Sequence, residues 1–394
     1  MKVLLVNTYY YPNMIGGTEH SVKLLAEGLS KKGHDVYVLT CDKHKDGDSI
    51  EVINGVNVIR LDLAYKSQSI AWKAFRKVIQ LRNFYILSKI NNILDEIKPD
   101  VVHTNNLIYL STIIWKSAFD RNIKVVHTLR DYWGICRKNT LLKKDGAICD
   151  QCELFCKLHS ANYKLLTKYV HTVTAASNFT LDLHVNRYYM FQDSKKRVVY
   201  NAIDFNNEEH LKILDEKANR ESGLVEFLFM GSLDYHKGIK FAVEAFKEVK
   251  NPNIRLNICG DGPLKQYVEE SAYKDKRIKY LGKVFDEEKE KILNRSDVMI
   301  VPSIWYEPFG RVVIEAYKYA MPVIGTNIGG IPELLTDNTS IKIQINNSKQ
   351  LINAIEKFSS RNYIRASIKG ISNNLSKYDL ENQIIKFESI YADN

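Results

Sequence analysis

The sequence has no long hydrophobic segment. Among its 394 residues, no run approaches 18 continuous apolar residues, and a membrane-spanning helix needs roughly that many. The opening stretch MKVLLVNTYYYPN contains too short an apolar run for the hydrophobic part of a secretory signal peptide. We therefore expect a cytoplasmic protein without a transmembrane helix.

The sequence also lacks a dinucleotide fingerprint. The first predicted strand, KVLLVN at 2–7, is not followed by G-x-G-x-x-G, which argues against a nicotinamide-dependent enzyme. Hydrophobic residues make up 45% and charged residues 26% of the chain, as in ordinary globular proteins. The length predicts two domains, each large enough for its own core.

Acidic residues are scarce in the first half of the chain. Residues 1–200 contain 29 Lys/Arg and 18 Asp/Glu, whereas residues 201–394 contain 27 and 28. The first half therefore carries the whole of the net charge of +10. This asymmetry indicates that the first half faces an anionic partner, such as nucleic acid, an anionic membrane surface or a phosphorylated substrate.

Short apolar runs predict a parallel sheet in the first half. KVLLVN (2–7) and DVYVLT (35–40) are predicted strands, and a helix between them begins near Thr18 and ends at Gly33. This βαβ pattern joins parallel strands. A further helix is predicted at 108–119. The other strands of this half are predicted at 100–105, 124–129, 172–177 and 197–203.

The same alternation begins again in the second half. Strands are predicted at 226–232, 254–260, 277–284, 297–303 and 322–326. Two α/β sheets in tandem explain this pattern better than one very large sheet, with residues 201–225 as the crossover. We predict one domain at 1–200, joined by a last helix at 376–394, and a second domain at 201–375.

Two glutamates follow the predicted strand 297–303. Glu307 lies in the loop before a helix that starts near Gly310, and Glu315 lies within that helix. The helical rise of ~1.5 Å per residue places Glu315 only about 7–8 Å beyond Gly310. Two carboxylates would thus border backbone N–H groups at a helix N-terminus, where anions are favoured. This arrangement suits a ligand with a central diphosphate and hydroxyl groups at each end.

Three more loops at strand ends contain glycines beside polar residues. Gly16-Gly17 precedes the first helix, GSLDYHKG (231–238) brings Lys237 to the start of another, and CGDGP (259–263) follows a strand. Small residues at such turns let backbone N–H groups approach a phosphate. Each loop alone also fits an ordinary βα turn, and Lys237 alone fits a solvated side chain. Their order along the chain is the stronger signal.

Taken in order, these segments resemble glycosyltransferase family 4. The resemblance covers nearly the whole chain and is most specific at 301–335. It implies the GT-B fold, an α/β architecture in which two Rossmann-like parallel-sheet domains face a central cleft, and transfer with retention of configuration at the sugar. The segments that carry it are PNMIGGTEHSVKLLAEGLSKKGHDVYVLT, VVYNAID, GSLDYHKG, CGDGP, YLGKV and VPSIWYEPFGRVVIEAYKYAMPVIGTNIGGIPELL.

The resemblance implies roles for individual residues. Glu307 would bind hydroxyl groups of the donor sugar and stabilise positive charge at the anomeric carbon, and Glu315 would bind the ribose. Lys237 and backbone N–H groups would hold the diphosphate, whose charge develops as it leaves. The catalytic residues implied are Glu307, Lys237 and Arg130. The donor-binding residues implied are Gly16, Gly17, Ser232, Lys237, Gly260, Val284, Glu307, Phe309, Gly310, Arg311, Val312 and Glu315.

The chain departs from the family pattern at two of these positions. Ser232 stands where members often have Arg, so diphosphate binding would rest more on Lys237 and helix N-termini. Arg130-Asp131 stands where many members have His-Asp. Arg130 could replace the histidine's substrate contact as a permanent cation, but it cannot act as a base. His127, three residues earlier, is predicted to be a packed histidine inside a strand.

The segment 136–159 contains four cysteines and a histidine. Cys136, Cys149, Cys152 and Cys156 precede His159 with the spacing C-x12-C-x2-C-x3-C-x2-H. Four thiolates could hold a structural zinc, although reduced thiols or an iron–sulfur site fit the same residues. We expect no cofactor to be required for catalysis.

Asp46-Gly47-Asp48 resembles a metal-binding Asp-x-Asp motif. Because it precedes the predicted hairpin at 51–61, it is better explained as a polar turn.

The region 60–90 is basic and amphipathic. From Arg60 to Lys89 it has seven Lys/Arg and one acid, Asp62. Its apolar residues fit either a core helix or a helix that binds an anionic membrane surface or acceptor. The apolar residues that fall near one helical face are Trp72, Phe75, Ile79, Ile86 and Ile90.

These observations predict a hexosyltransferase that moves a sugar from a UDP- or GDP-linked donor to a glycan acceptor. The resemblance places the acceptor on the first domain and indicates a polyprenyl-linked glycan, as in polysaccharide synthesis, rather than nucleic acid. Two alternatives remain from the sequence. One is a non-catalytic subunit that binds nucleotide sugars, favoured by Ser232 and Arg130. The other is a nucleotide-sugar epimerase on the same fold.

Overall fold

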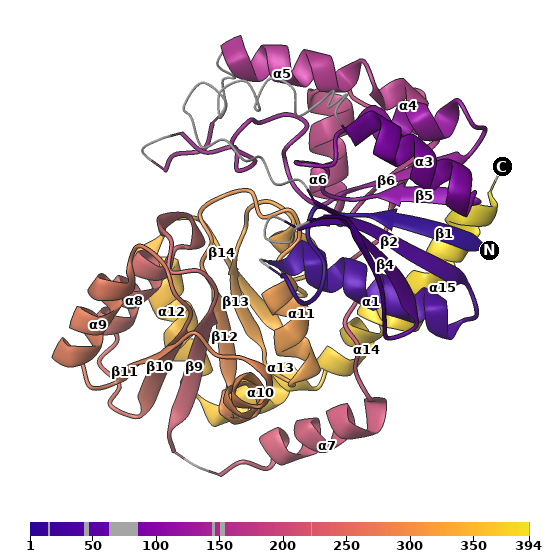
Figure 1. Cartoon of the computed structure of the whole chain (residues 1–394). Coiled ribbons are helices and arrows are strands. Elements are labelled where there is room, and N and C mark those ends of the chain that lie inside the picture. The colour runs from indigo at the N-terminus through magenta and orange to yellow at the C-terminus, as the bar shows by residue number, and fades with distance from the viewer. Residues whose placement is uncertain are drawn as a thin grey trace. The chain divides into compact units, whose positions relative to one another are not determined.

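The computed structural model describes residues 1–14, 16–42, 47–62, 86–143, 146–149, 154–221 and 223–393 (Figure 1). The chain forms two compact units. Unit 1 comprises Met1–Leu141, Cys149–Ala202 and Leu380–Asn394. Unit 2 comprises Leu142–Ile148 and Ile203–Asp379. The chain therefore leaves unit 1 and returns to it after unit 2.

Unit 1 is built on an eight-stranded sheet with the order β3-β4-β2-β1-β5-β6-β7-β8. All neighbouring strands are parallel except β3 and β4, which form the predicted hairpin. Asn54 and Gly55 connect these two strands with positive φ angles of 50° and 80°, as a tight hairpin turn requires. The strands are β1 (Lys2–Val6), β2 (Asp35–Asp42), β3 (Ser49–Ile53), β4 (Val56–Asp62), β5 (Val101–Thr104), β6 (Lys124–Leu129), β7 (Thr172–Ala175) and β8 (Lys195–Val198).

Helix α1 (Gly17–Lys31) follows β1 in unit 1. Its start is capped because the Gly16 N–H donates to Glu19 Oε2 over 2.8 Å, and its end precedes Gly33 at φ 87°. The other helices of this unit are α3 (Leu87–Ile97), α4 (Ile113–Phe119), α5 (Leu154–Lys164), α6 (Asn178–Asp182) and α15 (Leu380–Ala392).

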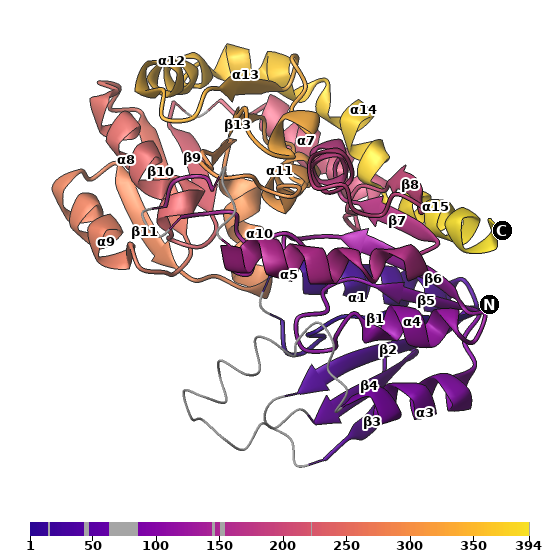
Figure 2. The same ribbon diagram turned by 90° about the horizontal axis from the view of Figure 1, so that it is seen from above.

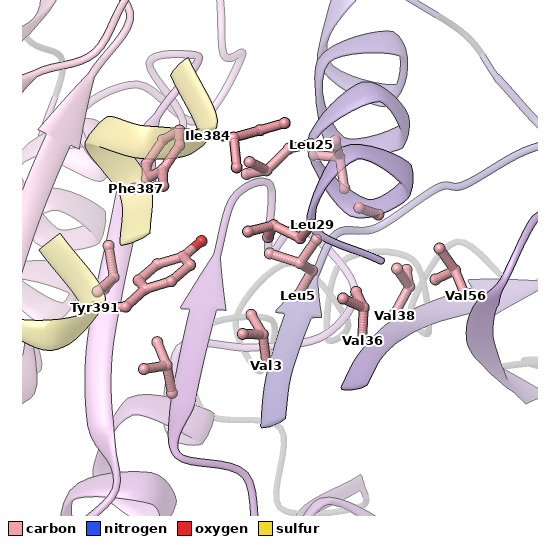
Figure 3. Packing of buried hydrophobic residues seen from close by; sticks show 14 of the residues in the cluster. Val3, Leu5, Leu25, Leu29, Val36, Val38, Val56, Ile384, Phe387 and Tyr391 are labelled. Carbon is pink, nitrogen blue, oxygen red and sulfur yellow. The ribbon is translucent and has the colours of Figure 1, made fainter. Parts of the chain in front are cut away.

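Helix α15 completes the core of unit 1. Figure 3 shows Phe387 and Tyr391 of α15 pointing towards the same apolar layer as Leu29 of α1 and Leu5 of β1. The two helices touch so closely that a Cβ on Gly28 would lie 2.4 Å from Ile384 Cδ1. The last helix is thus part of the hydrophobic core and not an appended tail.

Replacing Phe387 by Ala should destabilise unit 1 by about 3–5 kcal/mol, because a fully buried aromatic ring would leave a cavity. Urea unfolding followed by tryptophan fluorescence measures the change. Ile385 lies on the same helix but is 49% exposed, so Ile385→Ala is a matched control that should cost less than about 0.5 kcal/mol. Equal losses in both variants would show that α15 contributes no specific packing.

Unit 2 is built on a six-stranded parallel sheet with the order β11-β10-β9-β12-β13-β14. Most residues of its central strands are buried, as expected for a sheet with helices on both faces. The strands are β9 (Val225–Met230), β10 (Ile254–Cys259), β11 (Ile278–Gly282), β12 (Val298–Val301), β13 (Val323–Thr326) and β14 (Ser340–Ile343). The main helices are α7 (Asn207–Ala218), α8 (Ile239–Glu248), α9 (Lys265–Lys274), α10 (Asp286–Arg295), α11 (Arg311–Lys318), α12 (Ser348–Phe358), α13 (Arg361–Ile368) and α14 (Ile371–Leu375).

Helix α7 occupies residues 207–218 of the segment 201–225 that was predicted as the crossover, and this helix was not predicted from the sequence. Asn206 caps this helix by accepting from the Glu208 and Glu209 N–H groups over 2.8 and 3.2 Å. His210, Ile213 and Lys217 form its buried face. The spacing of these three residues is typical of a helix, but two of them are polar, so the sequence shows no apolar stripe here.

Two element boundaries also differ from the prediction. The helix predicted at 108–119 begins only at Ile113, because Ser111 adopts a positive φ of 64° that a continuous helix does not allow. The strand predicted at 197–203 ends at Val198, so residues 199–203 continue outside the sheet. Among the residues that the structure describes, no helix is both long and apolar enough to cross a membrane.

Candidate active site

The sheet of unit 2 has a switch point between β9 and β12. Strand β9 lies between β10 and β12, so the connections that follow β9 and β12 run in opposite directions along the sheet. In open α/β sheets, ligands bind beyond the carboxyl ends of strands at such a point. Lys237 lies in the connection after β9, and Glu307 lies in the connection after β12.

The structure brings the Lys237 and Glu307 side chains together. Lys237 Nζ donates a hydrogen bond to Glu307 Oε1, and Ser303 Oγ donates to the same oxygen over 3.2 Å. Burial alone would raise the pKa of Glu307. The Lys237 charge and hydrogen bonds from Lys237, Trp305 and Ser303 outweigh burial and hold this pKa below its usual value. Glu307 is therefore a partly buried carboxylate that keeps its negative charge at neutral pH.

The backbone of Glu307 is held as firmly as its side chain. Its N–H donates to the Trp305 carbonyl over 2.9 Å, and its own carbonyl accepts from the Gly330 N–H over 2.7 Å. Gly329 adopts a φ of 64°, and a Cβ there would lie 2.6 Å from both the N and the O of Glu307. Only glycine fits at this contact. The sequence showed the Gly329-Gly330 pair but gave no indication that it contacts Glu307.

Gly238 fixes the position of Lys237. A short 3₁₀ turn, η5 (Tyr235–Lys237), ends at Gly238 with a φ of 73°. A Cβ at Gly238 would lie 1.9 Å from the Pro302 carbonyl oxygen, so the loops after β9 and β12 are in direct contact. Lys237 Nζ also lies 5.1 Å from the centroid of the Trp305 ring, within the range of a cation–π interaction. Sequence reasoning missed Trp305 because aromatic residues beside a strand usually belong to a core.

The N-terminus of α11 lies in the same loop region. Gly310 precedes the helix with a φ of 99°, and Phe309 is buried beside it. The first turn of a helix presents backbone N–H groups that no intrahelical bond uses, and its dipole favours an anion. Arg311 and Val312, in this first turn, are both half-buried, and burial lowers the pKa of Arg311.

Glu315 lies one turn further along α11. Its Oε2 is 2.9 Å from Lys289 Nζ of α10, and its Oε1 is 3.9 Å from Arg311. The side chain is 17% exposed, so Glu315 is a partly shielded acceptor rather than a solvated surface group. Lys289 had no signal in the sequence, because it occurs within a run of charged residues on α10.

The remaining donor-binding candidates of unit 2 also follow strands of the sheet. Gly260 comes after β10 with a φ of 147°, and a Cβ there would lie 1.8 Å from the Gly231 carbonyl oxygen. Ser232 is exposed after β9, and Val284 is half-buried between β11 and α10. The carboxyl ends of these parallel strands share one edge of the sheet. That edge is also where Glu307 and Lys237 lie.

Arg130, predicted in unit 1, is a buried residue at the end of β6. Its Nε donates to Asn105 Oδ1 over 2.6 Å, and its guanidinium also donates to Asn201 Oδ1. His127 is packed in the core as predicted, with ring nitrogens bonded to Thr104 Oγ1 over 2.8 Å and Tyr163 OH over 3.1 Å. Burial lowers the pKa of His127 to about 3, so it is neutral. Gly16 and Gly17 lie at the start of α1, which follows β1.

The zinc hypothesis stays a prediction, because Cys152 lies outside the described residues. Among the described residues, Cys136 and Cys156 are not in disulfide bonds. His159 Nε2 donates to the Trp133 carbonyl over 2.6 Å. Within the described ranges, no three His, Cys, Asp or Glu side chains are grouped as a metal site.

Two other predicted features are only partly described. Asp46 lies outside the described residues, while the Asp48 carboxylate accepts from the Asp62 N–H over 2.9 Å and binds Lys89 at 2.8 Å. Asp48 thus has the structural contacts of a polar turn. Most of the amphipathic segment 60–90 also lies outside the described residues. Its described apolar members, Ile86 and Ile90, are fully buried.

The fold of the chain matches those of solved protein structures. Sucrose-phosphate synthase from Thermosynechococcus elongatus superposes with a TM-score of 0.75 at 19% identity, covering 99% of this chain and 98% of that one. HepE from Anabaena, in complex with UDP and glucose, gives 0.68 at 18% identity over 100% of both chains. At such identities the likeness concerns the fold. The chain has the GT-B fold.

The chain belongs to glycosyltransferase family 4. The family model described as Glycosyltransferase Family 4 matches residues 15–207, and that described as Glycosyl transferases group 1 matches residues 212–374. An uncharacterized 42.6 kDa protein in the cps region of Klebsiella pneumoniae is 33% identical over 346 residues, or 85% of this chain and 87% of that protein. The resemblance inferred from the motifs is confirmed.

Proposed function

We propose that this protein is a retaining hexosyltransferase that moves a sugar from a nucleotide diphosphate donor to a glycan acceptor. The contact between Lys237 and Glu307 carries the proposal. It places a cation and an ionised carboxylate at the switch point of unit 2, in the same loop region as the start of α11. A nucleotide-diphosphate sugar presents the complementary groups, which are an anionic diphosphate and a sugar with a developing positive charge.

Charge development explains why these residues would accelerate transfer. When the bond between the sugar and the diphosphate breaks, negative charge grows on the phosphate oxygens. Lys237, Arg311 and the first N–H groups of α11 would stabilise that charge without a divalent cation. Glu307 would bind hydroxyl groups of the sugar and stabilise the positive charge that grows at the anomeric carbon. Hydrogen bonds within the site hold Glu307 in place before the donor arrives.

The acceptor is proposed to be a lipid-linked glycan. The relative from the Klebsiella pneumoniae cps region supports a place in polysaccharide synthesis, and the basic surplus of residues 1–200 suits an acceptor with a phosphate group. We assign the acceptor to unit 1 and the donor to unit 2. HepE in complex with UDP and glucose supports UDP as the first nucleotide to test, with GDP as the second.

A thermal-shift screen of UDP-, GDP- and ADP-linked sugars tests the donor. We expect one class to raise the melting temperature, since a ligand that binds the folded state stabilises it. The selected donor is then incubated with a polyprenyl-diphosphate glycan, and NMR of the product reports whether the anomeric configuration is retained. A donor converted to its epimer without acceptor would contradict transfer. Binding without turnover for any acceptor would favour a non-catalytic subunit.

Replacing Glu315 by Gln should weaken binding of the donor's nucleoside diphosphate by about 10- to 100-fold, because charged hydrogen bonds contribute about 1.5–3 kcal/mol. Isothermal titration calorimetry with the nucleotide found in the screen measures the change. Glu287 on α10 is 90% exposed, so Glu287→Gln removes one charge from the same unit as a matched control. Unchanged affinity in the Glu315 variant would remove this residue from the ribose site.

A further inference from the structure

Helix α5 is anchored to unit 1 by one face. Tyr163 is buried, and its hydroxyl bonds His127 Nε2 over 3.1 Å. His159 Nε2 donates to the Trp133 carbonyl over 2.6 Å, and Leu166, just beyond the helix, is also buried. These residues define the face of α5 that packs on unit 1.

The opposite face of α5 exposes large apolar side chains. Leu154, Leu158 and Leu165 are 68%, 59% and 60% exposed. Leu154 and Leu158 are four residues apart on the same side of α5, and Leu165 directly follows the last residue of the helix. Phe155 and Tyr189 are 64% and 63% exposed. Single exposed leucines are common, but a group of exposed apolar side chains on one helix and the residues next to it indicates an interaction surface. We use the name outer α5 face for these five residues together with Lys157, Lys164 and Lys168.

The outer α5 face is basic as well as apolar. Lys157 and Lys164 of α5 are exposed, as is Lys168 in the 3₁₀ turn that follows the helix at Thr167–Tyr169. Lys164 Nζ lies 5.8 Å from the centroid of the Tyr189 ring. After Glu153, the chain has no Asp or Glu until Asp182. The described segment 154–181 thus carries positive charge without an acidic residue of its own.

We propose that the outer α5 face binds the surface of an anionic lipid bilayer. A helix of this kind buries its leucines among the acyl chains while the lysine stems extend to the phosphate groups. Exposed Phe155 and Tyr189 suit the headgroup region, where aromatic rings with a polar edge or a nearby cation are favoured. A single exposed helix is a ridge, which fits a flat, deformable surface, whereas a protein partner would need a matching groove.

Membrane binding by α5 is a property separate from sugar transfer, and it can be measured in the absence of a sugar donor or acceptor. It also differs from the membrane hypothesis for residues 60–90, since it uses other residues. In Figure 1, α5 lies along the outer edge of unit 1. In Figure 2, which is viewed from above, α5 lies in front of the strands of unit 1. A helix on the outside of its unit can reach a bilayer without rearrangement of the unit.

Vesicle flotation of the full chain tests whether the exposed leucines contribute to membrane binding. Vesicles of phosphatidylcholine and phosphatidylglycerol, at a ratio of about three to one, should float the wild type. Leu158→Gln with Leu165→Gln should lower the partition coefficient by about 100-fold, roughly tenfold for each leucine withdrawn from the bilayer. Leu211 and Ile385 are 48% and 49% exposed on α7 and α15, so their double Gln variant is a matched control that should float normally.

The contribution of the lysines to binding of anionic lipids is tested by replacing Lys157, Lys164 and Lys168 with Gln. This variant should lose the preference for anionic over pure phosphatidylcholine vesicles, and high salt should weaken wild-type binding in the same way. A matched control replaces the same number of exposed lysines in unit 2, which are Lys212, Lys265 and Lys291. That control should keep the preference.

Three results would overturn the proposal. The first is wild-type flotation by the Leu158/Leu165 variant, provided that its melting temperature shows a folded protein. The second is a change of oligomeric state in that variant on size-exclusion chromatography, with flotation unchanged, which would identify a second copy of the chain as the occupant. The third is loss of flotation only when Lys73, Arg76 and Lys77 are replaced by Glu, which would assign binding to residues 60–90. Failure of sugar transfer would affect none of these readouts.

Discussion

Replacing Glu307 by Gln should lower kcat for sugar transfer by about 10³-fold, because the carboxylate stabilises charge that exists only in the transition state. Gln keeps the shape of the side chain and can still accept hydrogen bonds from Lys237 and Ser303. The backbone contacts with Trp305 and Gly330 do not involve the side chain. Donor affinity should therefore change by less than about tenfold. Transfer assays and calorimetry on the same preparation separate the two effects.

An exposed glutamate provides the control for this experiment. Glu287→Gln removes the same charge from a side chain that is 90% exposed on α10, and its kcat should equal that of the wild type. A folded Glu307→Gln protein that transfers sugar at near the wild-type rate would contradict the assignment of the active site. A loss of affinity with kcat unchanged would make Glu307 a ground-state binding residue instead.

Replacing Lys237 by Met should reduce kcat/KM by about 10²- to 10³-fold through two effects. The diphosphate would lose a cation, and Glu307 would lose the charge that keeps it ionised. Because burial acts to raise the pKa of Glu307, removing Lys237 should move this pKa upwards. The acid limb of the pH–rate profile should then shift to higher pH, so that more activity is lost on acidification than in the wild type.

Lys237→Arg separates charge from geometry in the same experiment. Arg restores the positive charge, so the acid limb should return towards its wild-type position even if kcat/KM recovers only partly. Lys240, on the next helix, offers Lys240→Met as a control outside the contact with Glu307. An unchanged pH–rate profile in Lys237→Met would show that the ion pair does not set the protonation of Glu307.

The fold was predictable because its strands are short apolar runs at regular intervals. Buried parallel strands must be apolar on both faces, which made β1, β9 and β12 visible in the sequence. Helix α7 was missed because its buried face includes His210 and Lys217. Lys217 is accommodated there because its Nζ donates to three backbone carbonyls. The distances are 2.6 Å to Ser296 and to Tyr319 and 3.2 Å to Leu293. No local pattern reveals partners so distant in the chain.

The candidate site was predictable at the level of loops but not of contacts. Glu307 and Lys237 could be placed at strand ends because parallel strands carry their carboxyl ends at one edge. The contact of Gly329 with the Glu307 backbone, and that of Asn201 with Arg130, depend on how loops pack in three dimensions. A single sequence contains no record of such pairs, so Trp305, Lys289 and Gly329 entered the site only through the structure.

The return of the chain to unit 1 has a consequence for protein synthesis. Helix α15 supplies Phe387 and Tyr391 to the core of unit 1, yet the ribosome makes it only after the whole of Ile203–Asp379. At about 5–20 residues per second, that interval lasts roughly 10 to 35 seconds. During this time α1 and β1 have emerged, but the surface that α15 covers stays exposed to water and to other nascent chains. Unit 1 therefore completes its core only at the very end of synthesis, and the nascent chain should need chaperone protection over that unfinished surface until then.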